Sequence, residues 1–252
     1  MRIIITGAGS GIGAETARSF ARAEAKEGGR AALFLVDRNP EGIAALAREL
    51  GGIAQAHPFV ADLADRDAPD RIIAAAEQQM GGIDVLVSNA GVNIKAALED
   101  FTPEDLDLTF AVNTRATWAL ARAARPALAR AKGCVIAVTS IAGHHPGPGV
   151  GAYSASKAAL LMLVRQMAVE WSHDGIRFNS VSPGTVVTGL SPERYQTEEQ
   201  RQTARSRNPL GILGMPEHLA GVIRFLASPE AAYINGSDLI VDGGKQVTLM
   251  KA

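Results

Sequence analysis

Length, composition and charge limit what this chain can do. It has 252 residues, of which 47% are hydrophobic and 20% charged, and its formal net charge is −1. This nearly neutral balance argues against nucleic acid or a membrane surface as a partner. Its one cysteine excludes an internal disulfide, and no uninterrupted apolar run reaches the ~20 residues of a membrane helix. We therefore expect a soluble, cytoplasmic protein.

Seven short apolar runs rich in β-branched residues alternate with alanine-rich stretches of helical spacing. Such an alternation is typical of a parallel sheet covered by helices on both faces. It predicts an α/β fold, a doubly wound parallel sheet of about seven strands in a single domain over residues 1–252. Cys134, beside the fifth run, is predicted to be a buried strand residue. The expected strands are Ile3–Ile5, Leu33–Val36, His57–Val60, Val85–Val87, Val135–Val138, Arg177–Val181 and Leu239–Val241.

The first strand leads into a glycine-rich turn and then into a helix. Glycines permit a tight turn and a close approach of main chain to a pyrophosphate, and a helix N-terminus offers free N–H groups. The spacing departs from the pattern G-x-G-x-x-G, because Ile12 stands where the last glycine would be. The turn predicts dinucleotide binding and a Rossmann fold. Its expected cofactor-binding residues are Gly7, Ser10, Gly11, Ile12 and Gly13.

Asp37 ends the second predicted strand. A carboxylate there can accept hydrogen bonds from the adenosine ribose, and it repels the 2′-phosphate of NADP. Ser10 offers that phosphate no positive charge, although Arg38 could. The residues favour NAD over NADP, with Asp37 and Arg38 at the cofactor. The alternative is that Asp37 merely caps the turn that follows it.

Tyr153 and Lys157 lie four residues apart in a helical pattern, so they share a face of the helix. A neighbouring ammonium lowers the pKa of a phenol, which can then exchange a proton with an alcohol or a carbonyl. A surface pair is the alternative. Ser140 follows the fifth strand, at the edge of the sheet where ligands bind. Asn113, in an otherwise apolar helical pattern, needs polar partners; it could bend the helix or hold a water beside Lys157.

Together these motifs resemble the short-chain dehydrogenases/reductases. The resemblance extends from Met1 to about Gly244, and the motifs occur in that family's order. They are Thr6–Gly13, Asn89-Ala90-Gly91, Asn113, Ser140, Tyr153-x-x-x-Lys157, Pro183-Gly184 and Asp242-Gly243-Gly244.

The resemblance implies a role for each matching position. Tyr153 is expected to be the catalytic acid/base, and Lys157 to lower its pKa and hold the nicotinamide ribose. Ser140 is expected to orient the substrate, and Asn113 to anchor a water beside Lys157. No metal is expected. The further implied cofactor contacts are Asp62 and Leu63 at adenine, Asn89, Ala90 and Gly91 near the adenosine ribose, and Pro183, Gly184, Val186 and Thr188 at the nicotinamide.

The loop between Ser140 and Tyr153 is expected to border the substrate. We predict substrate contacts from Ser140, His145, Val150, Tyr153 and Thr185, with further pocket positions at Val92, Asn93 and Ile141. Few of these residues are charged, which favours a moderately apolar alcohol or ketone and leaves sugars open. The polar segment 189–215 is expected to be a mobile lid, and a solvated helix pair is the alternative.

The helical pattern from Ala155 to Trp171 is apolar on almost every face. Such a helix needs cover on both sides, so a second subunit is expected on the side away from the sheet. The resemblance suggests a homotetramer. The alternative is burial by the chain's own C-terminal segment.

We therefore expect an NAD-dependent oxidoreductase that interconverts a secondary alcohol and a ketone. The first alternative is an NADPH-dependent 3-oxoacyl-[acyl-carrier-protein] reductase, which would need a basic docking surface near the cavity mouth. The second is a sensor that binds a dinucleotide without catalysis.

Overall fold

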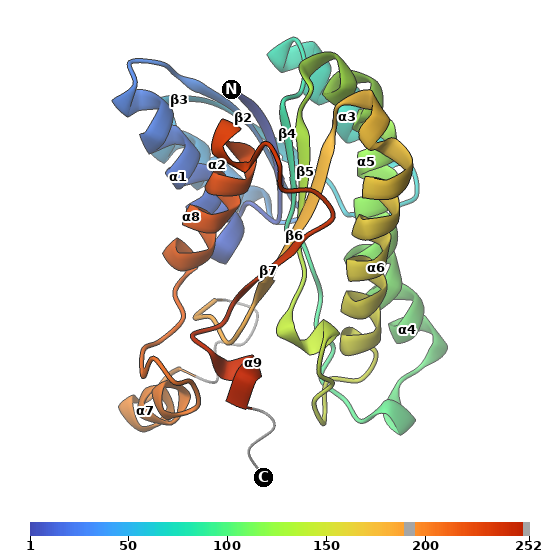
Figure 1. Cartoon of the computed structure of the whole chain (residues 1–252), viewed down its shortest axis with the longest axis vertical. Coiled ribbons are helices and arrows are strands. Elements are labelled where there is room, and N and C mark those ends of the chain that lie inside the picture. Colours follow the sequence, from blue (N-terminus) through green and yellow to red (C-terminus); the bar gives the residue numbers. More distant parts are fainter. Residues whose placement is uncertain (189–194, 249–252) are drawn as a thin grey trace.

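The computed structural model describes residues 1–188 and 195–248. In these residues seven strands form one sheet in the order β3-β2-β1-β4-β5-β6-β7, and all neighbours pair in parallel (Figure 1). Each predicted strand is present and extends beyond the predicted run at one or both ends. The strands are β1 Arg2–Thr6, β2 Ala31–Asp37, β3 Ala54–Val60, β4 Val85–Ser88, β5 Cys134–Val138, β6 Arg177–Pro183 and β7 Asp238–Val241.

Helices cover both faces of the sheet, which confirms the doubly wound fold (Figure 1). In β1 the Ile4 side chain packs in the core under α3, α5 and α6, whereas Ile3 and Ile5 pack under α1, α2 and α8. Such a strand, apolar on both faces, needs cover on both. The helices are α1 Gly11–Lys26, α2 Pro40–Leu50, α3 Ala68–Met80, α4 Pro103–Phe110, α5 Ala116–Ala131, α6 Tyr153–Trp171, α7 Glu198–Ser206, α8 Pro216–Ala227 and α9 Lys245–Thr248.

The strand order reverses between β1 and β4. From β1 the chain builds outward to β2 and β3, then returns to place β4 on the other side of β1. Connections on the two sides diverge at this point, which opens a crevice at the carboxyl ends of the strands. The glycine-rich turn follows β1, and Asn89 follows β4, so both lie at this crevice.

A π-helical turn, Ala111–Arg115, separates α4 from α5. Asn113 is its middle residue and is almost completely buried. The helical hydrogen bonding thus departs from the regular α pattern at Asn113, where the sequence analysis considered a bend.

Cys134 lies in β5 between β4 and β6, as predicted, and is 2% exposed. Burial raises the pKa of its thiol to about 11, because the thiolate would lose its hydration. The thiol therefore stays protonated at neutral pH.

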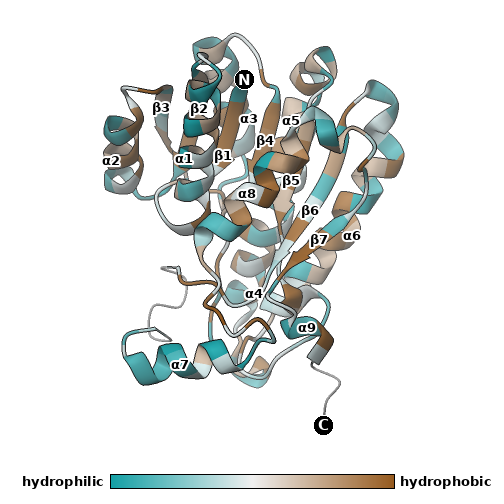
Figure 2. Ribbon diagram, turned by 60° about the vertical axis from the view of Figure 1, so that its left-hand side comes forward, coloured by the Kyte–Doolittle hydropathy of each residue, from teal (hydrophilic) through white to brown (hydrophobic). Residues whose placement is uncertain are grey.

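The sheet and α7, a helix that follows β6 in the chain, differ in hydropathy. Figure 2 shows β1 and β4 in the hydrophobic brown and α7 in the hydrophilic teal. α7 buries none of its residues, and a capping box at Thr197 defines its start. Over residues 1–188 and 195–248, no helix is both long and apolar enough to cross a bilayer.

Candidate active site

The glycine-rich turn after β1 is packed too tightly to accept a side chain at Gly7 or Gly13. A Cβ on Gly13 would lie 2.1 Å from the Gly7 carbonyl oxygen, and Gly7 itself has a φ of 65°. Asn89 fixes the turn from the neighbouring strand, because its Nδ2 donates to the carbonyls of Thr6 (3.0 Å) and Gly7 (3.2 Å). The turn therefore brings its main chain to the N-terminus of α1, where free N–H groups can bind a phosphate.

Asp37 is held at the rim of this turn. Its Oδ2 accepts a hydrogen bond from the Gly9 N–H, and its Oδ1 accepts one from the Asn39 N–H, both at 2.9 Å. Asp37 therefore does cap the turn that follows it, as the alternative interpretation of this residue proposed. Each carboxylate oxygen keeps a further lone pair for a ligand, so capping and ligand contact are compatible.

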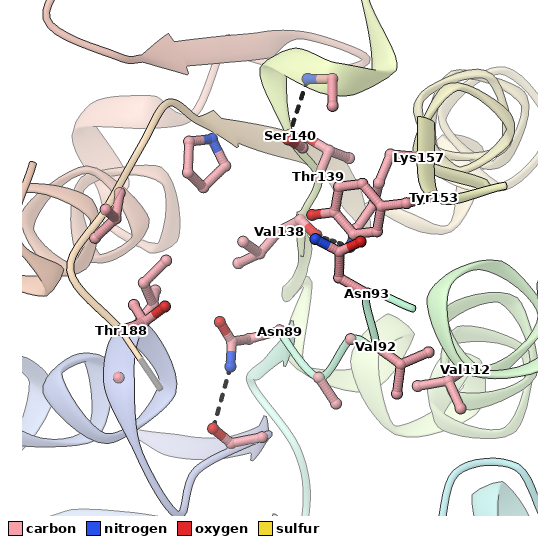
Figure 3. A pocket seen from close by; sticks show the side chains of 18 of the residues that line it. Asn89, Val92, Asn93, Val112, Val138, Thr139, Ser140, Tyr153, Lys157 and Thr188 are labelled. Carbon is pink, nitrogen blue, oxygen red and sulfur yellow. Dashed lines mark hydrogen bonds between the residues drawn. The ribbon is translucent and has the colours of Figure 1, made fainter. Parts of the chain in front are cut away.

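Lys157 is 3% exposed, and its Nζ donates to the Val138 carbonyl at 2.8 Å. Figure 3 shows it beside Tyr153, which projects from the same helix; the Nζ lies 5.8 Å from the centroid of the Tyr153 ring. Burial lowers the pKa of Lys157 to about 8. The pair is therefore inside the protein, which excludes the alternative of a surface pair.

The pKa of Tyr153 is raised, because burial disfavours the phenolate more than a hydrogen bond with the Ser140 side chain favours it. The net direction is therefore set by burial, and the expectation that Lys157 lowers this pKa stays a prediction. The Lys157 ammonium points at the Val138 carbonyl. The hydroxyl of Ser140 is the group that favours the Tyr153 phenolate here.

Asn113 connects the loop after β4 to α6. Its Oδ1 accepts from the Val92 N–H (2.8 Å), and its Nδ2 donates to the Val92 carbonyl (2.9 Å) and to Ser156 Oγ (3.0 Å). Ser156 in turn donates to the Tyr153 carbonyl at 2.7 Å. Both amide N–H groups are therefore used, so this side chain can hold a water only through the remaining lone pair of Oδ1.

One cavity of about 730 Å³ unites almost all the predicted site residues. We call its two ends the glycine-turn end, with Asp37 and Asp62, and the Ser140 end, with Tyr153 and Thr185. Gly13 and Asn113 do not line the cavity and support it from behind. The predicted residues that line it are Gly7, Ser10, Gly11, Ile12, Asp37, Arg38, Asp62, Leu63, Asn89, Ala90, Gly91, Val92, Asn93, Ser140, Ile141, His145, Val150, Tyr153, Lys157, Pro183, Gly184, Thr185, Val186 and Thr188.

The cavity fits an elongated dinucleotide. A glycine-rich turn meets the N-terminus of α1, carboxylates stand at one end, and hydroxyl groups stand at the other. In residues 1–188 and 195–248, no three His, Cys, Asp or Glu side chains cluster as metal ligands would.

Comparison with known proteins supports this assignment over the full chain. Residues 7–246 match a family model described as enoyl-(acyl carrier protein) reductase. The L-rhamnose 1-dehydrogenase (NAD(P)(+)) of Azotobacter vinelandii is 38% identical over 98% of this chain and 97% of its own length. The 3-oxoacyl-[acyl-carrier-protein] reductase of Thermotoga maritima is 36% identical over 96% of each chain. The crystal structure of a short-chain type dehydrogenase/reductase from Mycobacterium marinum superposes with a TM-score of 0.87 and 33% identity, over 97% of this chain and 94% of that one.

This chain is a short-chain dehydrogenase/reductase. It is an oxidoreductase that acts on CH–OH groups with a nicotinamide dinucleotide. The resemblance predicted from the motifs is thereby confirmed for the family, the fold and the class of reaction.

The Ser140 end of this dehydrogenase contains residues that the sequence analysis missed. Lys245 lines it and donates to Thr185 Oγ1 at 2.7 Å. Because Lys245 directly follows Asp242-Gly243-Gly244 at the end of β7, its position after the last strand was an available signal. Asn93 was expected here, and its Oδ1 is buried without a hydrogen-bond partner. The lining residues near Ser140 that the sequence analysis did not name as pocket residues are Leu108, Val112, Val138, Thr139, Ala142 and Lys245, whereas Pro146, Gly147 and Pro148 belong to the loop that was expected to border the substrate.

The two adjacent histidines point to different places. His145 lines the cavity, with its Nε2 lying 3.1 Å from the Gln246 Nε2, whereas His144 lies against Asp238. Of the predicted lid 189–215, Tyr195 and Arg207 also line the cavity. Residues 189–194 of that segment lie outside the described residues.

Proposed function

We propose that this short-chain dehydrogenase/reductase interconverts a secondary alcohol and a ketone, with Tyr153 as acid/base and NAD as cofactor. One observation carries the proposal. Tyr153 and Ser140 line the cavity that also contains the glycine-rich turn, and the Ser140 hydroxyl is close enough to Tyr153 to act on its pKa. Two hydroxyls that meet at one point can both contact a single substrate oxygen.

Each side chain has a distinct task in this proposal. In alcohol oxidation the Tyr153 phenolate accepts the hydroxyl proton, and in ketone reduction the phenol returns it. Ser140 donates to the same oxygen while charge develops on it. Lys157 would hold the nicotinamide ribose, and Asn113 would keep the loop after β4 against α6. Bound NAD would supply the hydride acceptor.

Asp37 is the reason to favour NAD over NADP. Hydrogen bonds from Gly9 and Asn39 fix its carboxylate at the cavity wall, where a 2′-phosphate would meet a negative charge. Arg38 lines the same end and is the one feature that would favour NADP. The rhamnose dehydrogenase relative is named for both cofactors.

The Ser140 end favours a more polar substrate than the sequence suggested. Arg207 and Lys245 line this end, and the cavity-lining carboxylates of the described residues, Asp37 and Asp62, lie at the other. The buried Oδ1 of Asn93 would accept a hydrogen bond from a substrate hydroxyl. We therefore propose a polyhydroxylated alcohol, a sugar or a sugar acid as substrate, which fits the named activity of the rhamnose dehydrogenase relative.

Reduction of 3-oxoacyl groups on a carrier protein is the second candidate, because the Thermotoga relative bears that name. It would need a basic docking surface near the cavity mouth. Arg130 and Lys132 stand at the end of α5 before β5 begins, whereas Ser140 follows the other end of β5. Arg130 also pairs with Glu77 at 2.5 Å. This cluster is therefore at the wrong edge of the sheet, and we rank this candidate second.

We further propose a homotetramer in the cytoplasm. On α6, Met162 is 59% exposed and Val169 is 80% exposed in the single chain. No described segment of the chain covers these side chains, which favours a second subunit over burial by the C-terminal segment.

The test is an assay of NADH formation with purified protein, NAD or NADP, and a panel of sugars, sugar acids, alditols and 3-hydroxyacyl thioesters. We expect turnover with NAD and a polyhydroxylated substrate, and at least a 10³-fold loss in Tyr153→Phe, which keeps the ring but not the hydroxyl. Unchanged turnover in Tyr153→Phe would overturn the assignment of the acid/base. Turnover only with the thioesters would promote the second candidate, and NADH binding without any turnover would favour the sensor.

A further inference from the structure

A buried carboxylate lies beneath the turn that carries Ser140. Asp238, the first residue of β7, has a side chain that is only 4% exposed. Its Oδ2 accepts hydrogen bonds from His144 Nε2 and Ser182 Oγ, both at 2.8 Å, and its Oδ1 accepts one from Ser180 Oγ at 2.6 Å. A buried carboxylate is costly without such donors, and the cavity that binds ligands does not use this one.

The same carboxylate is connected to the Ser140 turn on both sides. Ser140 caps a 3₁₀ turn, Ile141–Gly143, and His144 is the residue that ends it. On the other side, Thr139 Oγ1 lies 2.8 Å from Ser182 Oγ and 3.4 Å from Asp238 Oδ1. The residues immediately before and after the Ser140 turn are therefore joined to one anchor on β6 and β7.

Hydrogen-bond accounting fixes the roles within this cluster. A carboxylate can only accept, so the proton must stay on His144 Nε2, and Ser182 must donate to Asp238. The oxygen of Ser182 can then only accept from Thr139, whose single hydroxyl proton is shared with the Val181 carbonyl at 2.8 Å. Ser182 directly precedes Pro183 and Gly184, which line the cavity at the nicotinamide position expected from the sequence. The cluster thus connects the turn that bears Ser140 to the turn after β6.

On the side that faces α6, close packing restricts movement of the Ser140 turn. It packs on α6 so closely that a Cβ on Gly143 would lie 2.9 Å from the Lys157 carbonyl carbon. Loss of the anchor would let the turn move away from α6, because nothing else in the cluster replaces the His144 donor. Since Ser140 and Tyr153 must reach one substrate oxygen, a displacement of about 1 Å would have a large effect on catalysis.

We propose that His144 and Asp238 are positioning residues that hold the Ser140 hydroxyl in the cavity beside Tyr153. Neither side chain contacts the substrate in this proposal. They act through the Ser140 turn, so the inference rests on the proposed role of Ser140 in alcohol oxidation.

The kinetic test compares His144→Leu, which removes the donor, with His144→Gln, whose amide N–H can still reach Asp238. We expect kcat to fall about 10- to 100-fold in His144→Leu, while the Kd for NADH changes less than about twofold. His144→Gln should recover most of the lost kcat. The control is Asn235→Leu, which removes a hydrogen bond to the Phe178 N–H at the opposite end of β6. It should lower thermal stability but not kcat.

A double variant separates positioning from general damage. In a Ser140→Ala background, His144→Leu should have almost no further effect on kcat, because the group that it positions is gone. Additive losses would contradict the proposal, as would an unchanged kcat in His144→Leu.

A crystal structure of His144→Leu gives a result that does not depend on turnover. We expect the Ser140 hydroxyl to move by about 1 Å from the Tyr153 hydroxyl. An unmoved Ser140 would overturn the proposal even if no substrate were found. A moved Ser140 in a protein that oxidises no alcohol would support the anchor and reject the proposed function.

Discussion

The glycine-turn end of the cavity is built around a main-chain turn that cannot carry side chains at its glycines, whereas the Ser140 end is built from side chains of distant segments. Neighbouring atoms lie so close to Gly7 and Gly13 that neither residue could carry a methyl group. Asn89, which follows β4, fixes the turn by a hydrogen bond to the Thr6 carbonyl. The Ser140 end combines Ser140, Arg207 and Lys245 from three regions of the chain. A main-chain wall recognises what all dinucleotides share, and a side-chain wall can change without disturbing the sheet.

The sharpest way to break this comparison is to add one methyl group to Gly13, behind the glycine turn, and one to Gly147, at the Ser140 end. Gly13→Ala would drive a Cβ to 2.1 Å from the Gly7 oxygen, so we expect a loss of about 3 kcal/mol or more in the free energy of unfolding, or loss of NADH binding. Gly147 lines the Ser140 end, and the Cβ added by Gly147→Ala would have no atom within 4 Å. It should change the free energy of unfolding by no more than about 0.5 kcal/mol. Denaturant titration measures both, and equal effects would refute the contrast.

Asp37→Ser tests whether the glycine-turn end also selects the cofactor. Removing the carboxylate removes the repulsion of a 2′-phosphate, so the ratio of kcat/KM for NADP to that for NAD should rise about 10- to 100-fold. Asp65→Asn changes the net charge by the same amount outside the cavity lining and should leave the ratio unchanged. A ratio that does not move in Asp37→Ser would mean that Arg38 or another group decides the preference.

Lys157→Met should make the protein inactive and yet more stable at neutral pH. Burial lowers the pKa of Lys157 from 10.5 to about 8. Below pH 8 the lysine is therefore charged in both the folded and the unfolded state, and the folded state bears the full free-energy cost of burying the ammonium. Between pH 8 and 10 the unfolded state binds more protons, so wild-type stability should rise with pH relative to Lys157→Met. We expect the variant to be about 1–3 kcal/mol more stable at pH 7, with the difference shrinking by pH 9.5. Urea titrations at several pH values measure it, and a constant difference would contradict the assigned pKa.

Arg207→Gln should have the smallest effect, confined to the Ser140 end. Arg207 is exposed, so its attraction for an anionic substrate is screened by solvent. We expect KM for a sugar acid to rise about threefold while KM for the alditol of equal length stays constant. Arg205→Gln, on α7 but outside the cavity lining, is the matched control. Equal changes for both substrates would remove the argument for an anionic group.

The contrast between the two ends also explains what could be predicted from the sequence. The glycine-turn end depends on neighbours along the chain, so Gly7–Gly13 and the strands could be identified from local patterns. The pair of His144 and Asp238 lies 94 residues apart, and no local pattern brings the two together. The direction of the Tyr153 pKa shift depends on burial, which spacing along a helix does not report.

The isolation of Cys134 in β5 makes this protein convenient for spectroscopy. The chain has one cysteine, and its thiol is both buried and protonated at neutral pH. Thiol-directed dyes and spin labels should therefore leave the native protein unmodified. A second cysteine introduced at Gly147, on the exposed rim of the cavity, would be the sole reactive thiol. A reporter could then be attached beside the Ser140 end without first removing a native residue.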